Sequence, residues 1–365
     1  MIYLDNGATS FHKPASVMQA VQNAMRTCAN PGRGGYRQAY MAARTVLSCR
    51  EKAARLFDCQ PEQVVFTANC THGLNMAVNT LVKPGSRVVI TGFEHNAVTR
   101  PLYGLQAQVT IAGRKLFDWD ELLTSFENAL RNGVDVAVFT HVSNVFGYIL
   151  PVEKMAKLCR KWGVPFVIDA AQSAGALPVS LQSLGADFIA MPGHKGLLGP
   201  QGTGLLLCNR LPKPLLLGGT GSNSAQQEMP DFLPDAGEAG TLNVPGIAGL
   251  AAGLTYLQKT GIETIARREQ MQAQICAAGL KKQGFRVFAG EHQGGTVSFV
   301  PDIDCEDFAQ KLADRGVAVR AGLHCAPLAH ESAGTLQSGT VRVSFGYQCS
   351  NRETERFLQT VSALS

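Results

Sequence analysis

Residues 167–172 read Val-Ile-Asp-Ala-Ala-Gln, and residues 191–196 read Met-Pro-Gly-His-Lys-Gly. In the first stretch an apolar, β-branched run ends at the carboxylate of Asp169. In the second, an apolar run leads to Lys195, which stands among glycines. In a parallel α/β sheet, both side chains would emerge at the carboxyl ends of strands, where ligands bind. Lys195 follows Asp169 by 26 residues, which leaves room for one crossover helix between neighbouring strands.

A carboxylate and a lysine presented together suit the cofactor pyridoxal 5'-phosphate (PLP). The lysine forms a Schiff base with the aldehyde of PLP, and the aspartate pairs with the pyridinium nitrogen, which turns the ring into an electron sink. Either residue alone could be ordinary, since lysines are common on surfaces and aspartates often cap helices. The prediction of PLP therefore depends on the two residues together and on the motifs described below.

The composition favours a folded protein of about two domains. The chain has 365 residues, of which 45% are hydrophobic and 17% charged, enough apolar mass for a large core and too little charge for disorder. The net charge of +5 is mild, and basic residues never run longer than the pairs at 267–268 and 281–282. Because a nucleic-acid surface needs a clustered basic face, no nucleic-acid partner is expected.

The ten cysteines predict neither disulfides nor a metal site. The closest two, Cys49 and Cys59, are ten residues apart, so there is no CxxC pair, and most of the ten should be buried in a reducing compartment. The first residues, Met-Ile-Tyr-Leu-Asp, lack the basic and apolar regions of a signal peptide. The longest uncharged stretch, 239–258, is too rich in glycine to span a membrane. We expect a cytoplasmic protein without a membrane partner.

Apolar runs and helical periodicity alternate along the first two thirds of the chain. This alternation predicts a mostly parallel sheet with helices on both faces. The predicted strands are 64–67, 87–91, 108–112, 136–140, 165–169, 186–190 and 204–208. The predicted helices are 14–28, 36–57, 72–83, 119–131 and 151–162, with a glycine-rich loop at 30–35.

The pattern changes after a predicted long helix at 245–274. Residues 212–238 have little periodicity, and irregular segments of that length are usually functional or part of an interface. We expect a large PLP-binding α/β domain at 13–250 and a smaller α+β domain formed by 1–12 and 251–365, which carries a catalytic cysteine loop. The predicted elements of the smaller domain are helices 274–283, 305–315 and 351–363 and strands 294–300, 317–320 and 340–345.

Ten short motifs, each weak alone, occur in one order along nearly the whole chain. They lie at 4–9, 30–36, 66–71, 94–98, 143–144, 169–172, 193–195, 239–243, 320–326 and 341–344. In this respect the chain resembles the class V branch of the fold-type I PLP enzymes, specifically the cysteine desulfurase and selenocysteine lyase family. The stretch 320–326, Arg-Ala-Gly-Leu-His-Cys-Ala, and the lack of a long insertion resemble the Suf-type subgroup.

The phosphate of PLP needs backbone N–H donors at a helix N-terminus. Cys70 and Thr71 open the helix after strand 64–67 and could supply them, with Thr71 also suited to cap that helix. The resemblance implies that His194 also contacts the phosphate. It further implies that Thr241 reaches the cofactor from a partner subunit, so a homodimer is expected. Pro192 stands where relatives place a phosphate-binding serine, so one phosphate hydrogen bond should be missing.

The resemblance also assigns the residues around the ring and the substrate. His95 would stack on the PLP ring and relay protons. Asn144 and Gln172 would hydrogen-bond the phenolic oxygen, with Asn144 also near the substrate. Arg342 could form a bidentate pair with the substrate carboxylate, although a surface salt bridge is the ordinary alternative, and Arg320 is assigned to the substrate with it.

Cys325 is the candidate nucleophile. It lies in a glycine-containing loop with His324 beside it and Arg320 nearby, and we expect these neighbours to be cationic and to favour the thiolate. The resemblance implies that Cys325 attacks the sulfur of PLP-bound cysteine. The predicted function is then a cysteine desulfurase, which turns L-cysteine into L-alanine and leaves a persulfide on Cys325 for an acceptor protein.

Three other functions stay open at this point. A selenocysteine lyase would act on L-selenocysteine, whose carbon–selenium bond breaks more readily. Another class V enzyme, such as a transaminase or an epimerase, would use the same cofactor site for a different reaction. A non-catalytic sulfur-relay scaffold would need neither PLP nor Lys195, and the presence of that lysine argues against it.

Overall fold

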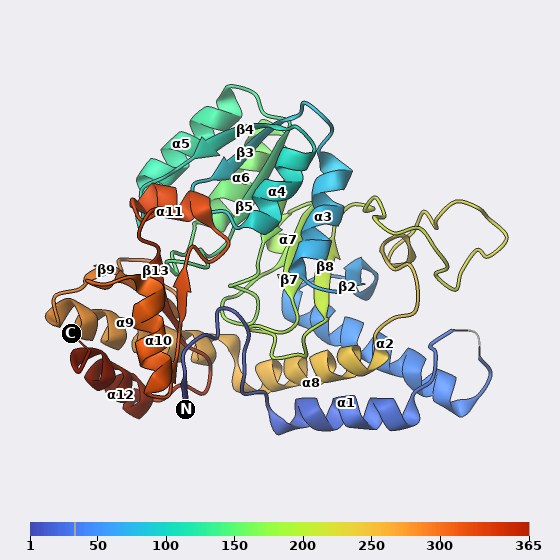
Figure 1. The fold of residues 1–365 in the computed structure, drawn as a ribbon. Coiled ribbons are helices and arrows are strands. Elements are labelled where there is room, and N and C mark those ends of the chain that lie inside the picture. The colour runs from blue at the N-terminus through green and yellow to red at the C-terminus, as the bar shows by residue number, and fades with distance from the viewer. Residues whose placement is uncertain (33, 365) are drawn as a thin grey trace.

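A seven-stranded sheet forms the centre of the molecule (Figure 1), and the computed structural model describes residues 1–32 and 34–364. Arg33, part of the predicted glycine-rich loop, lies outside the described residues. The strand order is β2-β8-β7-β6-β5-β3-β4, and only β8 runs antiparallel to its neighbours. The prediction of a mostly parallel sheet is therefore confirmed. The strands are β2 (Val64–Thr67), β3 (Arg87–Thr91), β4 (Gln108–Ala112), β5 (Val136–Thr140), β6 (Phe166–Asp169), β7 (Phe188–Pro192) and β8 (Gly204–Cys208).

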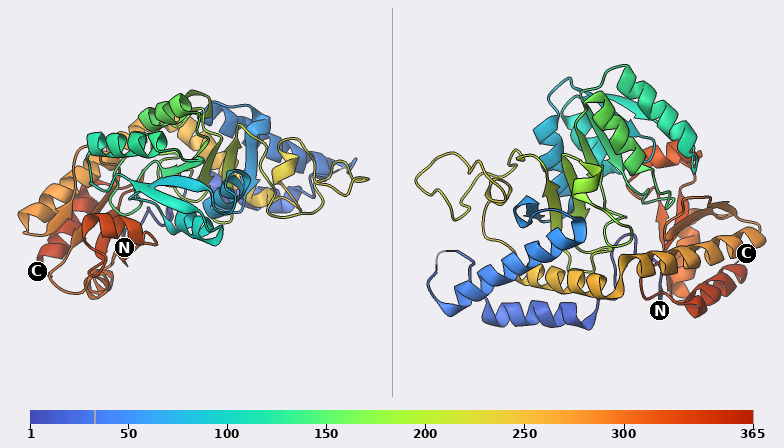
Figure 2. Two further views of the ribbon diagram at one scale, coloured as in Figure 1. Left: turned by 90° about the horizontal axis from the view of Figure 1, so that it is seen from above. Right: turned by 180° about the vertical axis from the view of Figure 1, so that it is seen from behind.

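Helices cover both faces of this sheet, as Figure 2 shows. Alternate residues of one strand enter different cores: Val138 packs with α3 and α4, whereas Phe139 packs with α5 and α6. Burial on both faces explains why these strands read as continuous apolar runs. The covering helices are α3 (Cys70–Leu81) and α4 (Asn96–Gly104) on one face, and α5 (Trp119–Arg131), α6 (Val152–Trp162) and the short α7 (Leu181–Leu184) on the other.

Three long helices pack beside one another at one edge of the molecule: α1 (Ala15–Thr27), α2 (Arg37–Phe57) and α8 (Val244–Thr260). The prediction of one helix at 245–274 is wrong. The chain breaks at Gly261, whose φ of +84° lies in the left-handed region that favours glycine. A second helix, α9 (Ile262–Lys282), then runs without interruption through the predicted boundary at residue 274.

A second, antiparallel sheet has the order β12-β13-β10-β9. Its strands are β9 (Arg286–Phe288), β10 (Thr296–Val300), β12 (Arg320–Gly322) and β13 (Thr340–Ser344), and its core is shared with α9, α10 (Cys305–Asp314) and α12 (Asn351–Ser362). The predicted strand 317–320 is wrong, because β11 (Val317–Ala318) instead pairs with β1 (Ile2–Tyr3). The helix α11 (Pro327–Ala333) follows β12 and was not predicted.

The predicted domain limits remain a prediction, although the two sheets suggest a division of this kind. The pairing of β1 with an element from the C-terminal third agrees with the predicted limits. The limit at residue 250 does not coincide with the end of an element, because α8 continues across it. The segment 212–238 is irregular apart from a short 3-10 turn at Asp235–Gly237, and it extends away from the sheet in Figure 1. None of the helices in the described part of the chain is long and apolar enough to cross a membrane.

Candidate functional site

A cavity with about 520 Å³ of empty space lies at the carboxyl ends of the parallel strands. Asp169 ends β6, Pro192 ends the neighbouring β7, and both line this cavity. The structure also brings eight predicted cofactor residues to its walls, which are Cys70, Thr71, His95, Asn144, Asp169, Gln172, His194 and Lys195. Thr241 is the exception, since it lines a different hollow on the surface.

Asp169 presents a buried carboxylate to the cavity. Its Oδ1 accepts hydrogen bonds from the backbone N–H of Ala171 at 2.8 Å and from the thiol of Cys70 at 3.5 Å. Burial, followed by the charge of Asp169, raises the pKa of Cys70 well above its ordinary value. Cys70 therefore stays a neutral thiol that donates to Asp169.

Lys195 is placed by a tight turn after β7. A Cβ atom at Gly196 would overlap the carbonyl oxygen of Ala174, so this position requires glycine. Burial lowers the pKa of the Lys195 ammonium, and the positive charge of Arg342 lowers it further, while Asp169 opposes the shift. A lysine with a lowered pKa is a better nucleophile and base near neutral pH.

The first turn of α3 faces the same cavity, because Cys70 and Thr71 are its first two residues. The predicted cap is wrong: Asn69 is the N-cap and accepts a hydrogen bond from the backbone N–H of His72 at 2.9 Å. His194 lies near by with Nδ1 at 3.1 Å from Thr9 Oγ1, and burial lowers its pKa to about 4. Backbone N–H groups at a helix start, together with neutral hydrogen-bonding side chains, suit a phosphate.

His95 is the N-cap of α4. Its Nδ1 accepts a hydrogen bond from the backbone N–H of Ala97 at 2.9 Å. Burial lowers the pKa of His95, although the charge of Asp169 opposes this. The ring is therefore neutral, with its proton on Nε2, and its position is fixed by the start of the helix.

Arg342 is buried on β13 and carries two hydrogen bonds. Nη2 donates to Asp5 Oδ1 at 2.7 Å, Nη1 donates to the backbone oxygen of Asn144 at 3.1 Å, and Nε has no partner among the described residues. Arg320 lies opposite Arg342 in the register of β12 and β13. The ion pair with Asp5 was not predicted, although Asp5 stands within the first motif at 4–9.

Cys325 is exposed, and its loop is attached to the cavity on two sides. The backbone N–H of Asn96, next to His95, donates to Cys325 O at 2.8 Å. The side chain of Asn144 donates through Nδ2 to His324 O at 2.8 Å, while its Oδ1 is buried without a partner among the described residues. The expectation that His324 is cationic is wrong, because burial and the charge of Arg342 lower its pKa well below the ordinary value.

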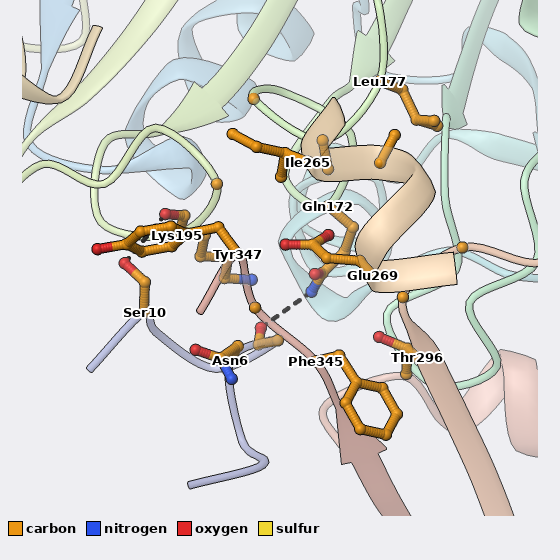
Figure 3. A pocket seen from close by; sticks show the side chains of 18 of the residues that line it. Asn6, Ser10, Gln172, Leu177, Lys195, Ile265, Glu269, Thr296, Phe345 and Tyr347 are labelled. Carbon is orange, nitrogen blue, oxygen red and sulfur yellow. Dashed lines mark hydrogen bonds between the residues drawn. The ribbon is translucent and has the colours of Figure 1, made fainter. Parts of the chain in front are cut away.

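Lys195 and Gln172 also line a second pocket, which holds about 770 Å³ of empty space (Figure 3). Gln172 Nε2 donates to the backbone oxygen of Gly7 at 3.0 Å, the dashed line in the figure. Glu269 points into this pocket from α9, and burial raises its pKa to about 8. The N-terminal segment and α9 therefore close the site behind Lys195, and neither was predicted to do so.

The residues of the cavity fit PLP in chemistry. Asp169 offers a carboxylate for a protonated ring nitrogen, Lys195 offers an amine for an aldehyde, and the start of α3 offers donors for a phosphate. Asn144 Oδ1 is a buried acceptor without a partner among residues 1–32 and 34–364, and such groups usually find a partner in the bound state. The fold and the site together define a PLP enzyme of fold type I.

Comparison with known proteins agrees with this class. The model of the aminotransferase class-V family matches residues 2–357, and the chain belongs to that family. It is 33% identical to a probable cysteine desulfurase of Pyrococcus abyssi, over 100% of this chain and 94% of the relative. A probable cysteine desulfurase of Methanothermobacter thermautotrophicus is 31% identical with the same coverage of both chains, 100% and 94%.

Solved structures show the same relationship. The apo cysteine desulfurase of Thermococcus onnurineus NA1 matches with a TM-score of 0.90 and 33% identity, over 100% of this chain and 94% of that one. The cysteine desulfurase CsdA of Escherichia coli matches with a TM-score of 0.85 and 26% identity, over 99% and 94%. The predicted resemblance to class V enzymes related to cysteine desulfurases is confirmed, and so is the fold class, while the Suf-type subgroup stays a prediction.

Proposed function

We propose that this protein is a PLP-dependent cysteine desulfurase of the Suf-type subgroup, which converts L-cysteine to L-alanine and leaves a persulfide on Cys325. The observation that carries the proposal is the attachment of the Cys325 loop to the cofactor cavity. Asn96 N–H holds Cys325 O beside His95, and Asn144 Nδ2 holds His324 O. An exposed thiol is thus presented next to a site that fits PLP.

When bound, PLP supplies an electron sink for the substrate Cα. The carboxylate of Asp169 would hold a proton on the ring nitrogen. Lys195 would hold the cofactor through Nζ, and its lowered pKa favours the neutral amine, which would remove the Cα proton of the substrate. His95, neutral with its proton on Nε2, would lie against the ring and exchange a proton there.

Arg342 and Asn144 orient the substrate carboxylate, and Arg320 adds positive charge on the same side. The Cys325 thiolate attacks the substrate sulfur. A sulfur–sulfur bond forms as the carbon–sulfur bond breaks, and the electron pair passes to the carbon fragment, which takes up a proton and leaves as alanine. One cysteine and one thiol thus give one alanine and one persulfide.

Replacement of Cys325 tests this step. We expect Cys325→Ala to lower alanine release from L-cysteine by roughly 10³-fold or more, because the nucleophile is gone, while the visible absorbance of the PLP–lysine Schiff base stays. Cys28→Ala, at the end of α1, is the matched control and should behave as wild type. Turnover of Cys325→Ala at the wild-type rate would contradict the proposal.

The same assay separates the alternative functions. A selenocysteine lyase would prefer L-selenocysteine and keep that activity in Cys325→Ala, since released selenide needs no thiol to capture it. A transaminase would yield a keto acid in place of alanine. A protein that cannot be loaded with PLP would indicate the non-catalytic scaffold.

We also propose a homodimer. Thr241 is exposed and lines a surface hollow with Phe66 and His72, away from Lys195, as expected if it serves the partner's site. Leu216 lines the same hollow, and apolar side chains are also exposed on α1, α2 and the segment 212–238, namely Met18, Met25, Tyr40, Leu47, Leu216 and Leu217. Exposed apolar surface of this kind is typical of an interface.

Two further assignments belong to the same proposal. The exposed Cys325 suits transfer of the persulfide sulfur to an acceptor protein. A cytoplasmic location agrees with the cysteines, since all ten lie within the described residues and carry free thiols.

A further inference from the structure

The side chain before Cys325 belongs to a chain of three buried groups that the proposed mechanism does not use. His324 Nε2 lies 3.3 Å from the backbone oxygen of Arg320, and His324 Nδ1 lies 3.5 Å from His330 Nε2. His330 Nδ1 lies 2.8 Å from Thr335 Oγ1. The two ring planes differ by 8° and their centroids are 5.7 Å apart, as expected for rings placed end to end with an N–H directed at the next nitrogen.

The direction of these hydrogen bonds follows from the groups at the two ends. A carbonyl oxygen only accepts, so His324 Nε2 must donate to Arg320 O. If His324 is neutral, its Nδ1 accepts from His330 Nε2, and a neutral His330 then accepts at Nδ1 from the hydroxyl of Thr335. The opposite direction would leave two acceptors facing each other at Arg320 O.

The surroundings keep both rings neutral. Burial lowers the pKa of His330 to about 4, although a hydrogen bond with the backbone of Thr335 opposes this shift. Burial lowers the pKa of His324 well below its ordinary value, and the charges of Arg342 and Arg320 act in the same sense. The largest influences on the two rings include no acidic side chain of the described residues. The hydrogen bonds therefore all have one direction, from Thr335 through His330 and His324 to Arg320.

The Cys325 loop, which these hydrogen bonds support, has an unfavourable backbone conformation. His324 and Cys325 have φ values of +52° and +55°, which residues with a Cβ atom adopt only when their surroundings impose it. The backbone oxygens of both residues are held, by Asn144 and Asn96. The loop is also held through the His324 ring, which the hydrogen bonds with His330 and Thr335 anchor to α11.

We propose that His330 and Thr335 are positioning residues, which hold the His324 ring and thereby fix the loop that presents the Cys325 thiol to the substrate. The proposal rests on the proposed role of Cys325, and neither His330 nor Thr335 touches the substrate. Loss of the Thr335 hydroxyl would leave His330 Nδ1 without its donor. His330 and His324 could then change which ring nitrogen carries the proton, and the loop would lose this support.

Two matched pairs of variants in the PLP-loaded enzyme test this. Thr335→Val removes the donor, whereas Thr335→Ser keeps it. His330→Leu removes the donor to His324, whereas His330→Gln keeps an N–H for it. Thr354→Val is the control, because Thr354 is buried in α12, donates to Gln272 Oε1 at 2.5 Å and lines neither pocket at Lys195.

The readouts are kcat and KM for L-cysteine, and hydrogen exchange of the Asn96 amide, which donates to Cys325 O. We expect Thr335→Val and His330→Leu to lower kcat about tenfold and to speed this exchange about tenfold, with KM nearly unchanged. Thr335→Ser and His330→Gln should stay near wild type. Thr354→Val should be less stable but keep kcat and the exchange rate.

The proposal is overturned if Thr335→Val and His330→Leu keep the wild-type kcat and exchange rate, if Thr335→Ser is as impaired as Thr335→Val, or if Thr354→Val shows the same loss. Failure of the proposed function is a different result. In that case the wild-type enzyme itself releases no alanine, while exchange of the Asn96 amide still reports whether His330 and Thr335 hold the loop.

Discussion

Two carboxyl groups near the cavity, those of Asp169 and Glu94, have different surroundings. Glu94 Oε1 accepts hydrogen bonds from Thr91 Oγ1 at 2.6 Å, Thr91 N at 3.2 Å and Thr140 N at 3.1 Å, while Oε2 is buried without a partner among the described residues. Burial raises the pKa of Glu94 to about 8, and the charge of Asp169 adds to this. Glu94 is therefore neutral at pH 7 and adds no second negative charge near Asp169.

This difference predicts a pH-dependent stability. The pKa of Glu94 is about 8 in the folded protein and 4.5 ordinarily, so between these values the unfolded chain binds fewer protons, and stability falls as pH rises. Glu94→Gln keeps an oxygen for the three donors and cannot ionise. We expect it to match wild type near pH 4.5 and to exceed its free energy of unfolding by a few kcal/mol at pH 8.

Urea denaturation of both proteins between pH 4.5 and 8 measures this difference. Glu51→Gln, on the exposed face of α2, is the control and should follow the wild-type curve. If the curves of Glu94→Gln and wild type stay parallel over the whole range, Glu94 is ionised in the folded protein.

At the scale of elements, the helices α3 and α4 begin at the wall of the cavity. Asn69 caps α3 and His95 caps α4, and both residues line the cavity proposed for the cofactor. A cap satisfies backbone N–H groups that a helix start leaves free, so the same local interaction that starts each helix also orients the site. The break between α8 and α9 has a similar local cause, in the left-handed backbone of Gly261.

Substitution of Gly261 tests that break. Gly261 has φ +84° and ψ 127°, and a Cβ atom there would meet only ordinary contacts with Thr264 and Glu263. The cost of Gly261→Ala is therefore conformational, and we expect a loss of about 1–3 kcal/mol in the free energy of unfolding. Gly104→Ala, where φ is not positive and no atom lies within 4 Å, should be close to neutral. Equal stabilities of the two variants would contradict this account.

How well each strand was predicted depends on whether local sequence or distant pairing partners determine it. The strands of the large sheet were predicted within about two residues because burial on both faces makes them continuous apolar runs. The run 317–320 was predicted as one strand, yet Val317 pairs with Ile2 and Arg320 pairs with Arg342. Ile2 and Val317 lie near opposite ends of the chain, and Arg320 and Arg342 are separated by the whole of α11, so neither pairing leaves a local pattern.

At the scale of the whole molecule, the proposed dimer makes each site depend on two chains. Lys195 would belong to one subunit and Thr241 to the other. We therefore expect Lys195→Ala and Thr241→Asp to be inactive alone, because the first removes the amine and the second places a negative charge against the phosphate. A mixed dimer of the two variants contains one site with both residues intact.

Refolding a mixture of the two variants measures this. Alanine release should return to about a quarter of the wild-type rate, since half of the randomly paired dimers are mixed and each has one intact site. Light scattering should report twice the mass of the 39.0 kDa chain. If no activity returns in a mixture that contains mixed dimers, Thr241 serves the site of its own chain.

The sequence by itself determined the class of chemistry and the parallel sheet, because strand burial and short motifs such as 167–172 and 191–196 are local properties of the chain. Only the tertiary structure decided that Asp5 pairs with Arg342, that His324 is neutral, and that Thr335 and His330 stand behind Cys325. The physical reason is that burial and hydrogen-bond partners depend on segments far apart in the chain. Desolvation, which shifts the pKa values of Lys195, His324 and Glu94 most, exists only once those segments have packed together.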